Sequence, residues 1–445
     1  VRSWLQPNML PKNFQLPKQF FLTGFIKGGL AQLQTSLQLN STSGNLQLKA
    51  RLEQITDKNK AHYDATFNTT DLHAGELTGD TSLGIISANG SLAGHSFNPD
   101  IMDAKAQLQI DKLEYNHYVY QGINMDASIA KSAYRFYLLS KDTSLSAEIK
   151  LQGSADSTHP SVNGNINLNK INLYAAHLSA QPLTIKGNIL LQLDNLLPRH
   201  LNGTININNL QIATAKEIIP FDTIQLTAKD SANQQYLTLS GLFGSLDASG
   251  NYDYTKISSS IQSLVQYHLQ PDTIKTKTLA DSSHQTLQLA ASLKWPVSFQ
   301  KIAPDLSMPQ PFLLQMHLNS DSNLLTAQWK LPVIKYGDLK IDSLNGNIKI
   351  NSDSLLSDIV LQRLYYPKFP LRKTSLHIAA AKGIVNGDIL LLDRKQRPGF
   401  QLGATFSMLG DQKYSLQLHQ NLLLNKKHWN VPADNIIKID NGKLN

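Results

Sequence analysis

The chain has 445 residues with 41% hydrophobic and 17% charged residues, a formal net charge of +8 at pH 7, and no cysteine. This composition excludes a disordered or collagen-like chain, and the lack of cysteine excludes thiol catalysis, cysteine-based metal sites and disulfides. Most lysine and arginine residues are scattered singly, and the densest clusters, Lys426–Lys427 and Arg394–Lys395 near Arg397, are small. Nucleic-acid binding requires basic residues clustered among aromatic residues, so no nucleic-acid partner is expected.

The first 27 residues are punctuated by Pro7, Pro11 and Pro17. Because proline disrupts helix interiors and central strands, residues 1–27 are predicted to be an extended lead-in. The chain starts at Val1 without a signal-peptide pattern, and no apolar run approaches the ~18 residues of a membrane-spanning helix. We therefore expect an interior piece of a longer polypeptide, whose inner-membrane anchor lies outside this chain.

Apolar and polar residues alternate in short runs from residue 28 to residue 269. The most regular stretch is 163–213, which contains three copies of one pattern, starting at Gly164, Gly187 and Gly203. Alternation with a period of two places isoleucine and leucine on one face of a strand and Asn, Lys, Gln or Thr on the other. Residues 28–269 are therefore predicted to form a first segment of antiparallel strands.

The period changes near the end of this segment. Apolar residues then recur at the spacing of one helix face, which predicts an amphipathic helix at about 256–269, ending before Pro271. Its apolar face comprises Ile257, Ile261, Leu264 and Val265. Two roles are open for this helix, gating of an apolar groove and simple capping of a sheet edge. The polar stretch 270–286 is predicted to be a loop and the best domain boundary.

Alternation resumes from residue 287 to residue 445, which predicts a second segment of strands. A short helical turn is expected around 299–303, before Pro304. Turn signals recur every 8 to 20 residues across the roughly 25 predicted strands, a spacing typical of antiparallel meanders. The irregular spacing excludes a fixed-period solenoid or propeller.

Motifs for catalysis are absent from the sequence. It contains no phosphate-binding loop, no HExxH, no GxSxG and no EF-hand loop, and its 13 histidines lack metal-ligand spacing. We therefore expect no enzyme activity, no catalytic residue, no metal and no cofactor.

The apolar face of such a sheet must be covered. Helices are too few, and the inward set is Leu and Ile with few of the aromatics that fill sandwich cores. This favours an all-β fold in which an elongated, curved, mainly antiparallel sheet forms an open apolar groove. The alternative is a string of sandwiches with dry cores. The residues predicted to line the groove are Leu46, Leu48, Leu108, Ile110, Ile149, Leu151, Ile166, Leu168, Ile189, Leu191, Leu193, Ile205, Ile207, Leu237, Leu239, Ile348, Ile350, Ile389 and Leu391.

Four stretches carry a resemblance to a known family. They are LPKNFQLPKQFFLTGFIKGGLAQL (10–33), GSLAGHSFNPDIMDAKAQLQIDKLEYNHYVYQGINM (90–125), LTLSGLFGSLDASGNYDYTKISSSIQSLVQYHL (237–269) and LLLNKKHWNVPADNIIKID (422–440). In this order they resemble the TamB family of translocation and assembly module proteins, within the AsmA-like group of bridge-like lipid carriers. The tryptophan-containing turn at Trp429 is similar to versions of the family in Bacteroidota.

The resemblance implies a periplasmic location and a bent β-groove of the kind called a β-taco. It also implies an inner-membrane anchor and a partner, an outer-membrane barrel of the BamA superfamily similar to TamA. Phospholipid transport and outer-membrane protein assembly are the roles it implies. The chain departs from the family pattern at both ends, because it has neither the anchoring helix nor an identifiable partner-binding segment.

Three functions remain open at this point. A lipid conduit would hold acyl chains on the Ile/Leu face. Burial of each CH₂ group contributes ~0.8 kcal/mol, so a 16-carbon chain would be bound by on the order of 10 kcal/mol. A chaperone or scaffold would pair its sheet edge with incoming strands of outer-membrane barrels. A structural surface protein would have dry cores and bind no ligand.

Overall fold

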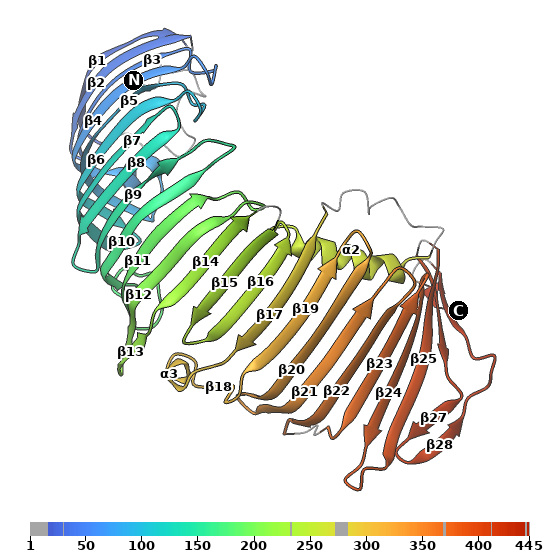
Figure 1. The fold of residues 1–445 in the computed structure, drawn as a ribbon. Coiled ribbons are helices and arrows are strands. Elements are labelled where there is room, and N and C mark those ends of the chain that lie inside the picture. Colours follow the sequence, from blue (N-terminus) through green and yellow to red (C-terminus); the bar gives the residue numbers. More distant parts are fainter. Residues whose placement is uncertain are drawn as a thin grey trace. The chain divides into compact units, whose positions relative to one another are not determined.

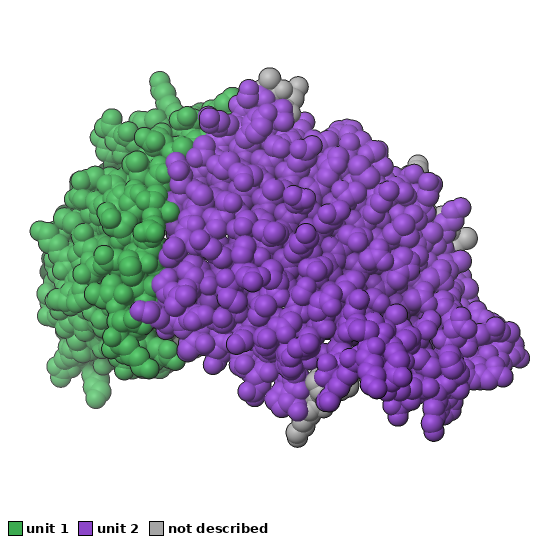
Figure 2. Space-filling view, turned by 60° about the horizontal axis from the view of Figure 1, so that its bottom comes forward, with its two compact units in different colours: residues 1–197, 203–223 green, residues 198–202, 224–445 purple. Residues whose placement is uncertain are grey.

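The computed structural model describes residues 17–29, 31–231, 234–271, 284–367, 371–410, 412–440 and 443–444. Strands dominate this part of the chain, with three short helices among them (Figure 1). The chain divides into two compact units. The first unit comprises residues 1–197 and 203–223, and the second comprises residues 198–202 and 224–445 (Figure 2). Each unit is a curved antiparallel sheet that does not close into a barrel, so the predicted all-β, antiparallel fold class is confirmed.

The first unit is a meander. Each strand from β1 to β10 pairs antiparallel with the next, and β13 pairs with β12. Its elements are β1 (Phe20–Gly29), β2 (Gln32–Ser41), β3 (Gly44–Glu53), β4 (His62–His73), α1 (Ala74–Thr78), β5 (Leu83–His95), β6 (Asp103–Tyr115), β7 (Tyr118–Ala130), β8 (Ala133–Lys141), β9 (Leu145–Ser154), β10 (Ser161–Asn172), β11 (Leu183–Asn195), β12 (Asn202–Thr214) and β13 (Ile218–Phe221).

Two-residue turns set the register of the central hairpins of this unit. Asn116 and His117 join β6 to β7 with φ values of 49° and 63°, and Lys131 and Ser132 join β7 to β8 with 47° and 67°. Positive φ at both central residues is the mark of a type I′ turn, whose twist matches that of the flanking strands. These tight turns keep the strands in the order of the sequence.

The second unit is also a meander, with β18 and the β27–β28 hairpin added at its margins. Its elements are β14 (Ile224–Ser231), β15 (Gln234–Gly241), β16 (Gly244–Asn251), α2 (Ile257–Leu269), β17 (Thr286–Leu293), α3 (Val297–Gln300), β18 (Leu306–Ser307), β19 (Phe312–Asn319), β20 (Leu324–Tyr336), β21 (Leu339–Ile350), β22 (Leu355–Tyr365), β23 (Thr374–Ala381), β24 (Ile384–Leu392), β25 (Pro398–Gly410), β26 (Lys413–Leu418), β27 (Asn421–Leu424), β28 (Lys427–Asn430), β29 (Ile437–Asp440) and β30 (Lys443–Leu444).

Helix α2 occupies Ile257–Leu269, as the apolar spacing predicts, and α3 begins two residues before the predicted turn at 299–303 and overlaps its first two residues. Of the predicted loop 270–286, residues 272–283 lie outside the described residues. Strand β16 pairs directly with β17 across this loop, so the sheet continues past it. The division between the units falls near residue 223, so the predicted segment 28–269 spans both of them.

The predicted lead-in differs from the structure where the structure describes it. Strand β1 begins at Phe20 and pairs with β2 along its whole length. The prolines that suggested an extended segment end at Pro17, so nothing in Phe20–Gly29 prevents pairing. Residues 1–16 of the lead-in lie outside the described residues.

A hydrophobic cluster forms where α2 lies along one rim of the second sheet. Leu264 of α2 packs with the ends of the strands below it, and Leu287, Leu318 and Ile350 are at most 2% exposed. Figure 1 shows α2 running along the ends of several strands of this unit. We refer to this margin as the α2 rim.

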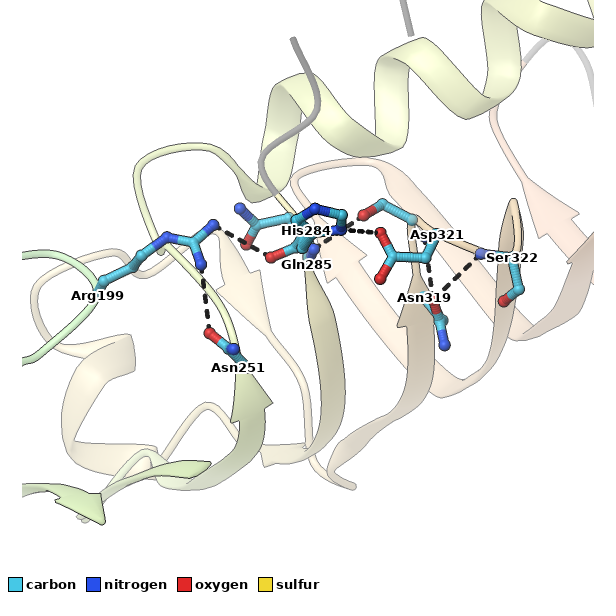
Figure 3. A network of polar contacts seen from close by, with 8 residues as sticks. Arg199, Asn251, His284, Gln285, Asn319, Asp321 and Ser322 are labelled. Carbon is cyan, nitrogen blue, oxygen red and sulfur yellow. Dashed lines mark hydrogen bonds and ion pairs between the residues drawn. The ribbon is translucent and has the colours of Figure 1, made fainter. Parts of the chain in front are cut away.

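Polar contacts fix the same rim (Figure 3). The Arg199 guanidinium donates to the carbonyl oxygen of His284 at 3.1 Å and to Asn251 Oδ1 at 3.4 Å. The His284 ring then contacts Asp321, with 2.5 Å between Nδ1 and Oδ1. The network joins residues 198–202 to β16 and to the turn after β19, all within the second unit.

Candidate functional site

The register of the first sheet brings the predicted isoleucines and leucines onto one face. Directly opposed residues of an antiparallel pair share a face. Ile166 of β10 is opposite Ile149 of β9 on one side and Ile189 of β11 on the other. Apolar rows therefore run across the strands, as well as along them.

All the predicted residues of the first unit lie in such strands. Pairing from β3 to β11 connects Leu46, Leu48, Leu108, Ile110, Ile149, Leu151, Ile166, Leu168, Ile189, Leu191 and Leu193 through one face. In β12, Ile205 and Ile207 alternate from Gly203, whose Cα lies so close to β11 that an added Cβ would stand 2.0 Å from the Gln192 carbonyl oxygen. We call this surface the first apolar face.

The second sheet has an apolar face of its own. Leu237 and Leu239 of β15 are opposite Ala248 and Leu246 of β16. The register carries this face through β17, β19 and β20 to β25. The remaining predicted residues that lie on it are Ile348, Ile350, Ile389 and Leu391. We call this surface the second apolar face.

Most of the predicted residues remain partly exposed on their faces. Only Leu193, at 5% exposure, and Ile350, at 0%, are fully buried among the 19 predicted positions. The described residues provide no second layer over the first apolar face, and they cover the second only at the α2 rim. Both faces thus offer a large apolar area to something outside the described chain.

Helix α2 covers the end of the second apolar face. Leu264 is 2% exposed, and Ile257, Ile261 and Val265 pack against the same cluster while remaining partly exposed. The helix therefore caps one rim of the sheet and leaves the rest of the face open.

Several residues of the two faces were missed by sequence reasoning. They include Met125 and Leu138, which are opposite the predicted Leu108 and Ile149, and Leu289 and Met316, which are opposite each other on the second apolar face. Glycines also belong to the faces, because Gly346 lies under the Trp329 ring and Gly90 under the Phe67 ring. Alternation extends to methionine and glycine positions, but only the register shows which aromatic ring covers which glycine.

The hollows of the surface lie on the opposite, polar faces. One of 1090 Å³ crosses β5 to β11 between two polar rows, one of which includes Lys105, Arg135 and Gln152. In each strand from β6 to β11 its lining comprises three consecutive residues, two of which have side chains on the polar face. Hollows of 650 and 600 Å³ have the same arrangement in the second unit. The apolar faces are therefore open surfaces, distinct from these hollows.

Titratable groups on the apolar faces lie near the sheet margins and include tyrosines. The Tyr134 hydroxyl donates to the Ser161 carbonyl oxygen at 3.1 Å, and burial raises the pKa of Tyr134. Burial likewise raises the pKa of Tyr252, which lies in the cluster under α2. In the part of the chain that the structure describes, no three His, Asp or Glu side chains are grouped as metal ligands. The two apolar faces are therefore suited to binding apolar ligands.

Comparison with known proteins yields no family model, no curated protein and no solved structure that matches the chain. Within the described residues, no helix combines the length and the apolar composition needed to cross a membrane.

Proposed function

We propose that the two apolar faces carry phospholipid acyl chains. The observation that supports this proposal is the partial exposure of 17 of the 19 predicted residues on continuous Ile/Leu surfaces. In a dry sandwich, the same positions would be buried under a second sheet. A hydrocarbon chain laid on the face would remove this area from water without needing any polar partner.

Energetics favour retention of lipid together with movement along the face. At ~0.8 kcal/mol per CH₂, a 16-carbon chain is held by on the order of 10 kcal/mol, so escape into water is rare. Neighbouring strands present chemically similar side chains, because Ile149, Ile166 and Ile189 follow one another across three of them. A hydrocarbon chain can therefore move from strand to strand while most of its area remains buried.

The place of this activity in the cell envelope rests on the resemblance of four stretches to the TamB family. Under this proposal the chain is a periplasmic segment that moves phospholipid between the inner and outer membranes and supports outer-membrane protein assembly. An inner-membrane anchor outside this chain and a TamA-like barrel of the BamA superfamily would be its partners.

The test replaces apolar residues of the faces with aspartate and measures bound lipid. Ile189→Asp, Ile207→Asp and Ile348→Asp together should remove most of the phospholipid that copurifies with the chain, because a carboxylate cannot be buried against hydrocarbon. Lipid mass spectrometry is the measurement. Leu190→Asp is a matched control, because Leu190 lies on the polar face of the same strand as Ile189 and is 36% exposed. Lipid content unaffected by the triple change would refute the proposal.

A second function, strand addition to client polypeptides, is favoured by strand β1. Among the described residues β1 pairs only with β2, and Phe21 and Ile26 on its two faces are each 66% exposed. An unpaired apolar edge is a template for another strand. A photocrosslinker placed at Ile189 should capture lipid if the apolar face is the conduit, whereas capture of polypeptide there would favour the chaperone function.

A further inference from the structure

The margin of the second sheet opposite α2 is rich in positive charge. It contains the connections from β20 to β21, β22 to β23, β24 to β25 and β27 to β28, and we call it the basic rim. Lysine and arginine outnumber aspartate there among the described residues. The cations are Lys335, Lys340, Arg363, Arg372, Lys373, Arg394, Lys395, Arg397, Lys426 and Lys427, and the aspartates are Asp338, Asp342 and Asp393.

Part of this charge projects from the apolar face itself. Leu361, Arg363 and Tyr365 alternate along β22, so all three side chains leave the sheet on the same side. The register places Asp342 opposite Arg363 and Lys340 opposite Tyr365. The side chains on the second apolar face therefore change from leucine to arginine and lysine next to the basic rim.

A small hollow lies at this transition. It has a volume of 230 Å³ and is lined by Asp342, Gln362, Arg363, Arg372, Lys373 and Gln396. The Asp342 carboxylate is already engaged, because the Lys340 ammonium lies 2.7 Å from it. Within the described residues Arg363, Arg372 and Lys373 have no carboxylate partner, so the hollow presents uncompensated positive charge.

Aromatic packing holds one of these cations in place. The Arg363 guanidinium lies over the Tyr365 ring, 5.4 Å from its centroid, and the Lys340 ammonium lies 5.3 Å from the same centroid. Such stacking orients the planar guanidinium while its remaining N–H groups stay available. Tyr336 and Tyr366, 65% and 55% exposed, add amphipathic rings to the same rim.

The two rims of this sheet differ in the groups that an amphiphilic molecule could contact. At the α2 rim, Leu264 and the strand ends below it form a closed hydrophobic cluster. At the basic rim the apolar face is uncovered and ends in Arg363 and its neighbours. A molecule with an acyl chain and an anionic head would match the open rim only in one orientation, with its head at the arginines.

We propose that the hollow at Arg363, Arg372 and Lys373 binds the phosphate of an anionic phospholipid whose acyl chains lie on the second apolar face. Guanidinium groups bind phosphate oxygens through paired, charge-assisted hydrogen bonds. A zwitterionic head carries the same phosphate together with a cation that the positive charge of the basic rim repels, so a head with net negative charge is preferred. The proposal rests on the proposed function, since it requires that the face holds acyl chains. It adds a substrate class, phospholipids with net negative charge.

The experiment loads the full chain from donor vesicles of phosphatidylglycerol or of phosphatidylcholine with the same acyl chains. Bound lipid is counted by native mass spectrometry. The wild-type chain should take up phosphatidylglycerol in about fivefold preference, as a charge-assisted contact allows. Arg363→Glu with Arg372→Glu should abolish this preference while phosphatidylcholine uptake persists.

Controls separate the headgroup site from general electrostatics and from free phosphate. Lys382, in the connection from β23 to β24, and Lys413, at the start of β26, lie at the α2 rim. Lys382→Glu with Lys413→Glu makes the same charge change there and should leave the preference intact. Arg372→Gln, a milder change, should reduce the preference and serves if the double variant does not fold. Inorganic phosphate at about 10 mM, well below the physiological ionic strength of ~0.15 M so that general screening stays small, should not prevent uptake.

The failures can be told apart. A wild-type chain that takes up neither lipid overturns the proposed function. Uptake without a preference, or a preference that survives both Arg372→Gln and the double change, overturns the headgroup site alone. Loss of phosphatidylglycerol uptake in inorganic phosphate would instead assign the hollow to free phosphate.

Discussion

The covered end of the second apolar face and the open middle of the first arise from the same sequence pattern. Leu318 and Ile350, under α2, are completely buried, whereas Ile149 and Ile166 in the first unit remain partly exposed. All four residues stand at alternating positions in antiparallel strands. Alternation thus decides which face is apolar, and a separate element decides whether that face is buried.

The two units also secure their margins differently. The second unit uses the 13-residue α2, whereas the described part of the first unit has only the five-residue α1. A buried carboxylate, Asp142, organises the turn between β8 and β9 instead. It accepts a hydrogen bond from the Tyr118 hydroxyl at 2.5 Å and others from the backbone N–H groups of Gln121, Ser144 and Leu145. One margin is thus held by apolar packing and the other by a polar anchor.

The largest effect is expected where the apolar face is covered. Leu318→Ala removes a side chain that is 0% exposed, and it should lower the free energy of unfolding of the second unit by about 3 kcal/mol through lost transfer energy and a cavity. Hydrogen exchange followed by mass spectrometry across a urea series would report each unit separately. A loss below about 1 kcal/mol would mean that α2 does not close this rim.

Much of the fold could be predicted because the dominant signal was local. Period-two alternation in 163–213 needs no long-range information, and neither does the 3.6-residue spacing of Ile257, Ile261 and Leu264. The segment boundaries depend on pairing between distant residues. The pairing of β16 with β17 across the polar loop 270–286 leaves no mark on the local composition.

Which residues form the apolar faces could be predicted from the sequence. How far each face is covered, and which residues lie at its margins, could not. The predicted isoleucines and leucines lie where alternation places them, but their exposure depends on α2 and on the absence of a second layer among the described residues. The basic rim was not predicted as a unit, because Arg363 and Arg372 are distant in the sequence from the small clusters at Arg394–Lys395 and Lys426–Lys427. Only the hairpin register brings their connections to one margin.

An intermediate effect, dependent on pH, is expected at Asp142. Burial raises the pKa of this carboxyl, but the hydrogen bonds from Tyr118 and from backbone N–H groups outweigh it, and the pKa lies below its ordinary value. A carboxyl whose pKa is lower in the folded than in the unfolded state stabilises the folded state. This contribution is fully present at pH values above the unfolded pKa of ~3.9, and it is lost as the pH falls through the folded pKa.

Asp142→Asn should therefore destabilise the first unit by about 2 kcal/mol near neutral pH, since it removes charge-assisted hydrogen bonds to a buried group. The difference from wild type should stay constant down to about pH 5 and shrink below about pH 4. Urea unfolding monitored by hydrogen exchange at several pH values would measure it. A difference that grew on acidification would show that the carboxylate does not anchor this margin.

The smallest effect is expected on the open face. Ile166→Ala removes a side chain that is already partly exposed, so less area returns to water and no closed cavity forms; the expected loss is about 1 kcal/mol. The same urea series, run on lipid-free protein, would measure it beside Leu318→Ala. A loss as large as that of Leu318→Ala would show that a further layer covers the first apolar face in solution. A small loss in the lipid-free chain that grows when phospholipid is bound would identify the acyl chain as the missing cover.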